Sequence, residues 1–411
     1  FVYSHCTIFQ MIKAWIYPHK KKIFFAIIIC VAVIAVFAFF FKKKNINTPE
    51  LQNTSVAFLS QKSAWADSLM ACMSVEEKAG QLLMTCINTN QKKEILIEEV
   101  KAVKPGGIYI AAGSARRLGQ TTRLLGENTR VPILFAVNAP CGFCSPDDSL
   151  STCATMPGID LLNDTNLIKT LSEHITMQMK HYGIHINMLL PLQAITANQD
   201  IPYDRSSISF ISGLQKKLLK QNRLFREAGI LACAHGFNNS EENTPAFDLP
   251  AFDSLRKKVL SGLACSGLQS VLVNCNGTKT CDSLVNTYKY QGLILSCFSQ
   301  PLQDESAAYT ILNSGCDMLV LNEGKKELAT KIIQGIANGK IAGDVLDKKV
   351  KRILMIKSWV LQNNMLATNA DSADFVCTSA RSKQLYHRVV EASAVLLNNR
   401  ENIVPLRRYE K

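Results

Sequence analysis

The chain has 411 residues, of which 47% are hydrophobic, and a formal net charge of +13. This length and hydrophobic content are enough to bury one large core or two modest ones. Seven of the positive charges are lysines in residues 1–44, which contain no acidic residue, and the remaining excess is mild and spread out. Basic pairs such as Lys216 and Lys217 are therefore expected to be solvated helix faces, and no nucleic-acid partner is predicted.

The first predicted element is an apolar run from Ile23 to Phe41 that contains no charge, proline or glycine. As a helix it would be roughly 28 Å long, enough to cross the hydrocarbon core of a bilayer. Residues 1–22 form a short basic segment, within which residues 1–10 are interpreted as an upstream extension and Met11 as the start. The run is too long for a cleaved signal peptide and has no small-residue cleavage site after it. The sequence therefore predicts an uncleaved signal anchor, with the following domain on the extracytoplasmic (periplasmic) side.

Residues 42–64 are expected to be a polar linker, after which short apolar runs alternate with longer amphipathic segments. Nearly all of these runs are continuously hydrophobic, as expected for strands buried on both faces of a parallel sheet. There are eight of them, at Leu82–Ile87, Gly107–Ala112, Ile133–Asn138, Ile184–Leu190, Ile230–Ala234, Ser270–Asn274, Gly292–Cys297 and Met318–Asn322.

Helical patterns separate several of these runs, and a (β/α)8 TIM-type barrel over residues 65–361 is the predicted fold. An open doubly wound sheet is the alternative, weakened by the absence of a GxGxxG turn after the first strand. Residues 341–361 are predicted to form a closing helix, and residues 362–411 a helix at Ser382–Ala394 with a lead-out towards a second domain. The other predicted helices are Asn166–His181, Ser209–Ala228, Asp253–Ser266, Gln303–Gly315 and Lys325–Asn338.

The chain has 14 cysteines, but they do not form paired CxxC motifs at metal-binding spacing. Cys141 and Cys144 make one isolated CxxC without a nearby histidine, so no metal site and no cofactor are predicted. Four cysteines lie within apolar runs, namely Cys86, Cys233, Cys275 and Cys297. They are expected to be buried thiols that behave as small hydrophobic residues.

Eight segments follow one another in a distinctive order and spacing: Trp65–Gln81, Pro105–Ile108, Val131–Val137, Tyr182–Asn187, Asp204–Ser206, Gly229–Ala234, Gly292–Leu295 and Ala394–Leu406. Together they resemble glycoside hydrolase family 3, in its β-N-acetylglucosaminidase branch. The resemblance implies a barrel linked to a sandwich domain, and retaining hydrolysis by an aspartate nucleophile at the end of the seventh strand. It also implies an Asp-Ser-His acid/base group on a loop after the fifth strand.

The catalytic positions depart from that pattern. The nucleophile position is Cys297, and the two proton-transferring positions of the loop are Thr244 and Ala246. A further aspartate of the family, after the fourth strand, is replaced by Ala194. A thiol is nucleophilic only as a thiolate, and burial in apolar surroundings raises its pKa. The catalytic group that the resemblance implies is therefore not intact.

Three positions are left as candidates for sugar binding. Asn138 stands where the family has a sugar-clamping aspartate, and it can still hydrogen-bond hydroxyl groups without a charge. His235 lies where a Lys-His pair is expected, although a histidine at a strand end is often satisfied by a backbone partner. Arg205 matches the arginine that the family has at this position, and it would either hold a sugar or pair with Asp204.

Two functions are compatible with this pattern. The first is a catalytically inactive, membrane-anchored barrel that binds an N-acetylglucosamine-containing, peptidoglycan-type glycan or an envelope protein. The second is an active β-N-acetylglucosaminidase in which Glu241 or Glu242 supplies the acid. Among the strand ends only Glu323 is a carboxylate, and a glycosidase needs two close together. A mouth filled by Phe237 or Phe298 would exclude a sugar.

Overall fold

The computed structural model describes residues 56–60, 62–139, 142–143, 162, 164–191, 219–238, 267–274, 279–297, 305–321, 326–363, 377 and 379–393. All of them belong to the second of two compact units, Asn53–Lys411. The predicted anchor, Ile23–Phe41, lies outside these residues and stays a prediction. Within the described part of the chain, no helix combines the length and the hydrophobicity needed to span a membrane.

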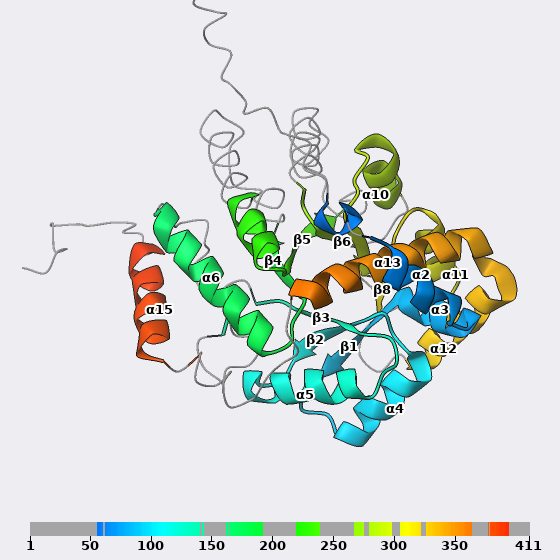
Figure 1. Ribbon diagram of the computed structural model, residues 1–411, viewed down its shortest axis with the longest axis horizontal. Helices are drawn as coiled ribbons and strands as arrows, with labels where there is room; N and C mark the ends of the chain where they lie inside the picture. Colours follow the sequence, from blue (N-terminus) through cyan, green and yellow to red (C-terminus); the bar gives the residue numbers. More distant parts are fainter. Residues whose placement is uncertain are drawn as a thin grey trace, which may run out of the picture. The chain divides into compact units, whose positions relative to one another are not determined.

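The core is a closed barrel of eight parallel strands in the order β1 to β8 (Figure 1). The ring closes where β8 pairs with β1, with Leu83 opposite Leu319. This closure rules out the open doubly wound sheet, and the predicted barrel with its eight strands is confirmed. The strands are β1 (Leu83–Asn88), β2 (Gly107–Ala112), β3 (Leu134–Val137), β4 (Ile186–Pro191), β5 (Leu231–Asn238), β6 (Ser270–Asn274), β7 (Leu293–Cys297) and β8 (Met318–Leu321).

Helices surround the barrel, and α15 lies outside α6 (Figure 1). In α6 the side chain of Asp164 caps the first turn by accepting the N–H groups of Asn166 and Leu167. The helices are α2 (Ala64–Ala71), α3 (Val75–Gln81), α4 (Lys93–Val103), α5 (Ala115–Glu127), α6 (Thr165–His181), residues 219–227, α10 (Lys279–Asp282), α11 (Ser306–Asn313), α12 (Lys326–Gly335), α13 (Gly343–Asn363) and α15 (Ala380–Ser393), with short turns η1 (Ala57–Ser60), η4 (Ser283–Thr287) and η5 (Ile336–Lys340).

The predicted helices that fall on described residues are confirmed. α6, α11, α12 and α13 match the predicted segments to within a few residues, and α15 matches the helix predicted at Ser382–Ala394. The described part of Ser209–Ala228 is helical from residue 219, and Asp253–Ser266 lies outside the described residues. The sequence analysis predicted no helix where α2 to α5 lie. These helices fall in the segment Trp65–Gln81 and in the connections from β1 to β2 and from β2 to β3.

Towards the N-terminal end of the barrel, apolar side chains fill the lumen. A Cβ atom added to Gly107 would lie 2.6 Å from the Cε of Met84 and 3.3 Å from the Cε of Met318. Two methionines from β1 and β8 therefore occupy the space in front of β2. The barrel is a packed core at this level, as is usual for the fold.

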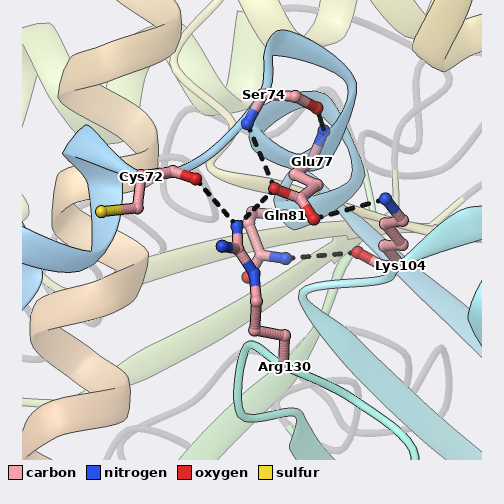
Figure 2. A network of polar contacts seen from close by, with 6 residues as sticks. All are labelled: Cys72, Ser74, Glu77, Gln81, Lys104 and Arg130. Atoms are coloured by element: carbon pink, nitrogen blue, oxygen red, sulfur yellow. Dashed lines mark hydrogen bonds and ion pairs between the residues drawn. The ribbon is translucent and has the colours of Figure 1, made fainter.

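A polar network ties the segments that enter β1, β2 and β3 at the N-terminal end of the barrel (Figure 2). Ser74 and Glu77 form a capping box at the start of α3. The Glu77 carboxylate also pairs with Lys104, at 3.3 Å, and with Arg130, at 2.5 Å. Arg130 donates a further hydrogen bond to the carbonyl oxygen of Cys72, at 3.0 Å. One carboxylate thus organises three connections.

The backbone approaches itself closely beside this network. The N–H of Gly106 donates to the carbonyl oxygens of Gly80 and Leu83, each at 2.9 Å. A Cβ at Gly106 would lie 2.0 Å from the carbonyl oxygen of Gln81, so no larger residue fits. The Gln81 side chain donates to the carbonyl of Lys104 and accepts from Lys357 of α13. The closing helix therefore seals the N-terminal end with a lysine that is 1% exposed.

Candidate functional site

The C-terminal ends of the strands form the candidate site, because barrels of this type place their reacting groups there. Within the described residues, seven side chains in β1, β2, β6, β7 and directly after β3 stay partly exposed although their strands are in the core. We call five of them the mouth residues, Cys86, Tyr109, Asn138, Leu272 and Cys297, and the other two are Asn88 and Ala111. Two of them, Asn138 and Cys297, are sequence-predicted site residues.

Electrostatic contacts across the barrel show that several of these side chains point into the lumen. Burial raises the pKa of the Tyr109 phenol to about 12, and Cys86, Cys297 and Cys233 act in the same direction. Cys233 on β5 and Cys297 on β7 are not neighbours of β2 in the sheet. Only the lumen brings side chains of these strands near one phenol. This group was not predicted from the sequence, because its members lie on strands far apart in the chain.

Cys297, at the predicted nucleophile position, ends β7 as expected. Its strand register places it beside Asn274 of β6 and Val320 of β8. Its sulfur makes a long contact of 3.8 Å as donor to the carbonyl oxygen of Val273. A sulfur that donates carries its proton, whereas attack on a sugar would need the thiolate. The contact with Val273 is therefore one that a protonated thiol makes.

The four cysteines that were predicted to be buried thiols do not all behave alike. Cys233 is fully buried, as predicted, and burial raises its pKa to about 12, so it is protonated at neutral pH. Cys86 and Cys297 are partly exposed, so the prediction that they are buried was wrong. They lie towards the C-terminal ends of their strands, where side chains reach solvent. The hydrophobicity of the sequence alone does not reveal this exposure. Cys275 lies outside the described residues.

Asn138 follows β3 directly and is held in place by a neighbouring amide. The side chain of Asn187 on β4 accepts the N–H of Ala139 at 3.0 Å and donates to the carbonyl of Ala139 at 2.8 Å. Asn187 is fully buried, so these bonds are shielded from water. The sequence carries one signal for this positioning role, because Asn187 is a polar residue inside an otherwise apolar run. Asn187 was nevertheless not predicted as a site residue.

The eight strands that the structure describes contain no aspartate or glutamate. The buried carboxylate Asp317 precedes β8, at the opposite end of the barrel from the mouth. There it accepts the N–H of Ile294 at 2.9 Å and pairs with Arg352 at 3.4 Å. The described strands therefore bring no proton-transferring carboxyl group to the mouth. No cluster of histidine, cysteine, aspartate or glutamate that would hold a metal ion occurs among the described residues either.

The other predicted site residues are placed only in part. His235 belongs to β5, where its backbone pairs with Pro191 and Leu272, but its side chain lies outside the described residues. The same holds for the side chain of Phe237. Entirely outside the described residues are Ala194, Arg205, Glu241, Glu242, Thr244, Ala246, Phe298 and Glu323. Their roles stay predictions.

Comparison with known proteins gives a match of fold. No family model and no curated protein sequence matches the chain. A solved β-glucoside phosphorylase, BglX bound to 2FGlc, is 16% identical, with a TM-score of 0.67 over 85% of this chain and 71% of that one. An exo-1,3/1,4-β-glucanase from a Pseudoalteromonas species is 15% identical, with a TM-score of 0.61 over 86% of this chain and 50% of that one.

A fungal multi-domain β-N-acetylglucosaminidase of glycoside hydrolase family 3 is 16% identical, with a TM-score of 0.63 over 81% of this chain and 45% of that one. The chain thus spans about half the length of two of these three proteins. At such identities the similarity concerns the arrangement of the backbone, and the chain has the barrel fold seen in family 3 glycoside hydrolases.

Proposed function

We propose that this chain is a family 3 glycoside hydrolase-like barrel without catalytic activity, a pseudoenzyme that binds a glycan or a protein of the cell envelope. The observation that carries the proposal is that none of the eight described strands contains an aspartate or a glutamate, while β7 ends in Cys297. Retaining hydrolysis needs two carboxyl groups about 5 Å apart at this end of the barrel. The described part of the mouth offers a phenol, thiols and one amide instead.

Binding of an N-acetylglucosamine-containing, peptidoglycan-type glycan is the version we favour. It is supported by the partly exposed Asn138, whose neighbour Ala139 is held by the Asn187 amide. It is also supported by the glycoside-processing proteins that share the fold, one of which is a β-N-acetylglucosaminidase. Arg205 and His235 would add further contacts. The apolar run Ile23–Phe41 would anchor the protein in a membrane with the barrel on the periplasmic side.

Absence of turnover is tested with an aryl N-acetyl-β-glucosaminide and the full chain. We expect no release of the aryl group above the buffer rate. The matched variants are Glu241→Gln and Glu242→Gln, which keep the size of the side chain and remove the acid. A rate in the unmodified protein that disappears in either variant would establish the active hydrolase and overturn the pseudoenzyme proposal.

Glycan binding is tested by calorimetric titration with a chito-oligosaccharide. Removing one neutral hydrogen bond costs about 1 kcal/mol, so Asn138→Ala is expected to weaken binding by about fivefold. Asn313→Ala is the control, because this exposed residue ends α11, which leads back to the N-terminal end of the barrel. If the unmodified protein does not bind the oligosaccharide, the glycan version fails and an envelope protein partner is favoured.

A further inference from the structure

The C-terminal helix α15 lies along α6 (Figure 1). One face of α15 is buried, at positions three or four residues apart, while the other face is charged. The buried residues are Ser382, Leu385, Tyr386, Val389 and Ser393. The polar members of this face take part in a hydrogen-bond network with α6.

Gln178 of α6 is the centre of that network. Its Oε1 accepts the N–H of Phe143 at 2.8 Å, and its Nε2 donates to the carbonyl of Phe143 at 2.7 Å. Gly142 makes this close approach possible: its φ is +73°, and a Cβ there would lie 2.2 Å from Oε1 of Gln178. Because both amide groups are bound to backbone groups of opposite polarity, the orientation of the Gln178 amide is fixed.

Two residues connect this amide to α15. The hydroxyl of Tyr386 donates to the carbonyl of Phe143 at 3.3 Å and to Oε1 of Gln178 at 3.4 Å. Nε2 of His174 lies 3.2 Å from Nε2 of Gln178 and 3.0 Å from the hydroxyl of Ser382. An amide nitrogen only donates, so Nε2 of His174 has to be the acceptor. The hydrogen bond from Gln178 to His174 therefore requires a neutral imidazole whose proton is on Nδ1.

We propose that His174, Gln178 and Tyr386 form a pH-sensitive latch, closed while His174 is neutral, that fastens α15 and the loop after β3 to α6. Protonation would place a second N–H on Nε2, facing the N–H of the Gln178 amide. The two donors would repel, and the His174 ring would have to turn away from its contact with Tyr386, whose ring centroid is 5.6 Å away. The latch is a property of the fold and does not depend on sugar binding at the mouth.

The surroundings of His174 oppose its positive charge. Burial lowers the pKa of His174 below 6.5, and the nearby Arg381 guanidinium of α15 lowers it further. Glu173 on the same helix is largely exposed and pairs with Lys169 at 3.7 Å. Among the described residues, the other ionisable groups in contact with the network are Tyr386 of α15, Tyr182 directly after α6, and Cys377, whose sulfur contacts Gln178 and the Tyr182 hydroxyl.

The latch bears on the mouth because the described parts of the β3 loop are held by two side-chain amides. Asn187 binds both backbone groups of Ala139, next to Asn138, and Gln178 binds both backbone groups of Phe143. Among the described residues, loss of the second attachment leaves Ala139 bound to Asn187 and to the N–H of Gly142 but frees Phe143 from α6.

Hydrogen exchange followed by mass spectrometry on the full chain tests the latch at pH values from 7.5 to 5.0, after correction for intrinsic exchange. The open form binds the proton more tightly, so the opening constant of α15 is expected to rise up to about tenfold per pH unit below 6.5. If the protection of α15 is unchanged over this range, the proposal is overturned.

Three variants assign the effect to His174. His174→Gln keeps an acceptor and cannot titrate, so the protection of α15 should become independent of pH. His387→Gln, on the exposed face of α15, should leave the pH response intact. Arg381→Gln removes the opposing charge at an exposed site and brings the pKa of His174 in the closed form nearer to that of the open form. The rise in the opening constant should therefore be smaller and level off at a higher pH, and this arm decides the question if His174→Gln does not fold. A response that persists in His174→Gln, disappears in His387→Gln or does not become smaller in Arg381→Gln contradicts the latch.

Discussion

Replacing Lys357 by methionine is expected to stabilise the protein at neutral pH. Lys357 lies on α13 inside the N-terminal end of the barrel, and its ammonium group donates to the Oε1 of Gln81. Burial lowers its pKa from 10.5 to about 7. In the unfolded chain the same group is solvated and keeps its proton up to about pH 10.5.

The sign and size of the effect follow from proton linkage. Between pH 7 and 10.5 the unfolded chain binds a proton that the folded protein has released, so the free energy of unfolding rises with pH by about 1.4 kcal/mol per unit. At pH 7.5 the lost proton corresponds to about 4 kcal/mol against folding. Methionine removes this cost, while the side-chain carbonyl of Gln81 loses its donor at a cost of about 1–3 kcal/mol. The net expectation is a gain of about 1–3 kcal/mol.

Urea unfolding at pH 7, 8 and 9 measures the stability gained by Lys357→Met and how this gain changes with pH. The difference between Lys357→Met and the unmodified protein should shrink as the pH rises, because the unmodified protein gains stability that the variant already has. Lys348→Met is the control on the same helix, at an exposed position that pairs only with Asp344 on its own helix. Parallel pH curves for Lys357→Met and the unmodified protein would refute the reasoning.

Three further predictions concern the same end of the barrel. Gly106→Ala should destabilise by more than about 3 kcal/mol in urea unfolding, because its Cβ would overlap a backbone oxygen, whereas Gly126→Ala, with nothing within 4 Å, should stabilise by up to about 1 kcal/mol. His185 accepts the N–H of Phe135 at 3.0 Å, and its pKa is lowered to about 4, chiefly by burial. Because the unfolded value is 6.5, the free energy of unfolding should fall by about 3 kcal/mol as the pH drops from 6.5 to 4. His185→Gln should remove that part of the slope, and an unchanged slope would contradict the assignment. Glu77→Gln should lower the thermal stability by about 1–2 kcal/mol, mostly at low salt, and a loss insensitive to salt would show that the ion pairs contribute little.

The strand positions were predictable because each strand is buried on both faces. The predicted bounds of β2 and β6 match the structure residue for residue, since Gly107–Ala112 and Ser270–Asn274 are bounded by turn or polar residues. At β5 the strand continues to Asn238, beyond the predicted end at Ala234. His235 and Gly236 are residue types that often end a strand, but pairing with Pro191 and Leu272 extends it.

The candidate site was predictable only where one residue follows one strand. Cys297 and Asn138 were placed correctly at the ends of β7 and β3. The grouping of Tyr109 with three thiols was not predictable, because it depends on which strands face each other across the lumen. The role of Glu77 was equally hidden: its segment resembles the family, yet the structure places it in a stabilising network at the end opposite the mouth (Figure 2).

The sequence by itself determined the eight parallel strands and the closing helix, because these follow from local hydrophobicity and residue identity. Only the tertiary structure decided that the barrel closes through β8 and β1, and that the described buried carboxylate Asp317 lies away from the mouth. It also decided that His174, some 200 residues before Ser382, contacts that residue. Contacts between distant segments depend on packing geometry, which no local pattern encodes.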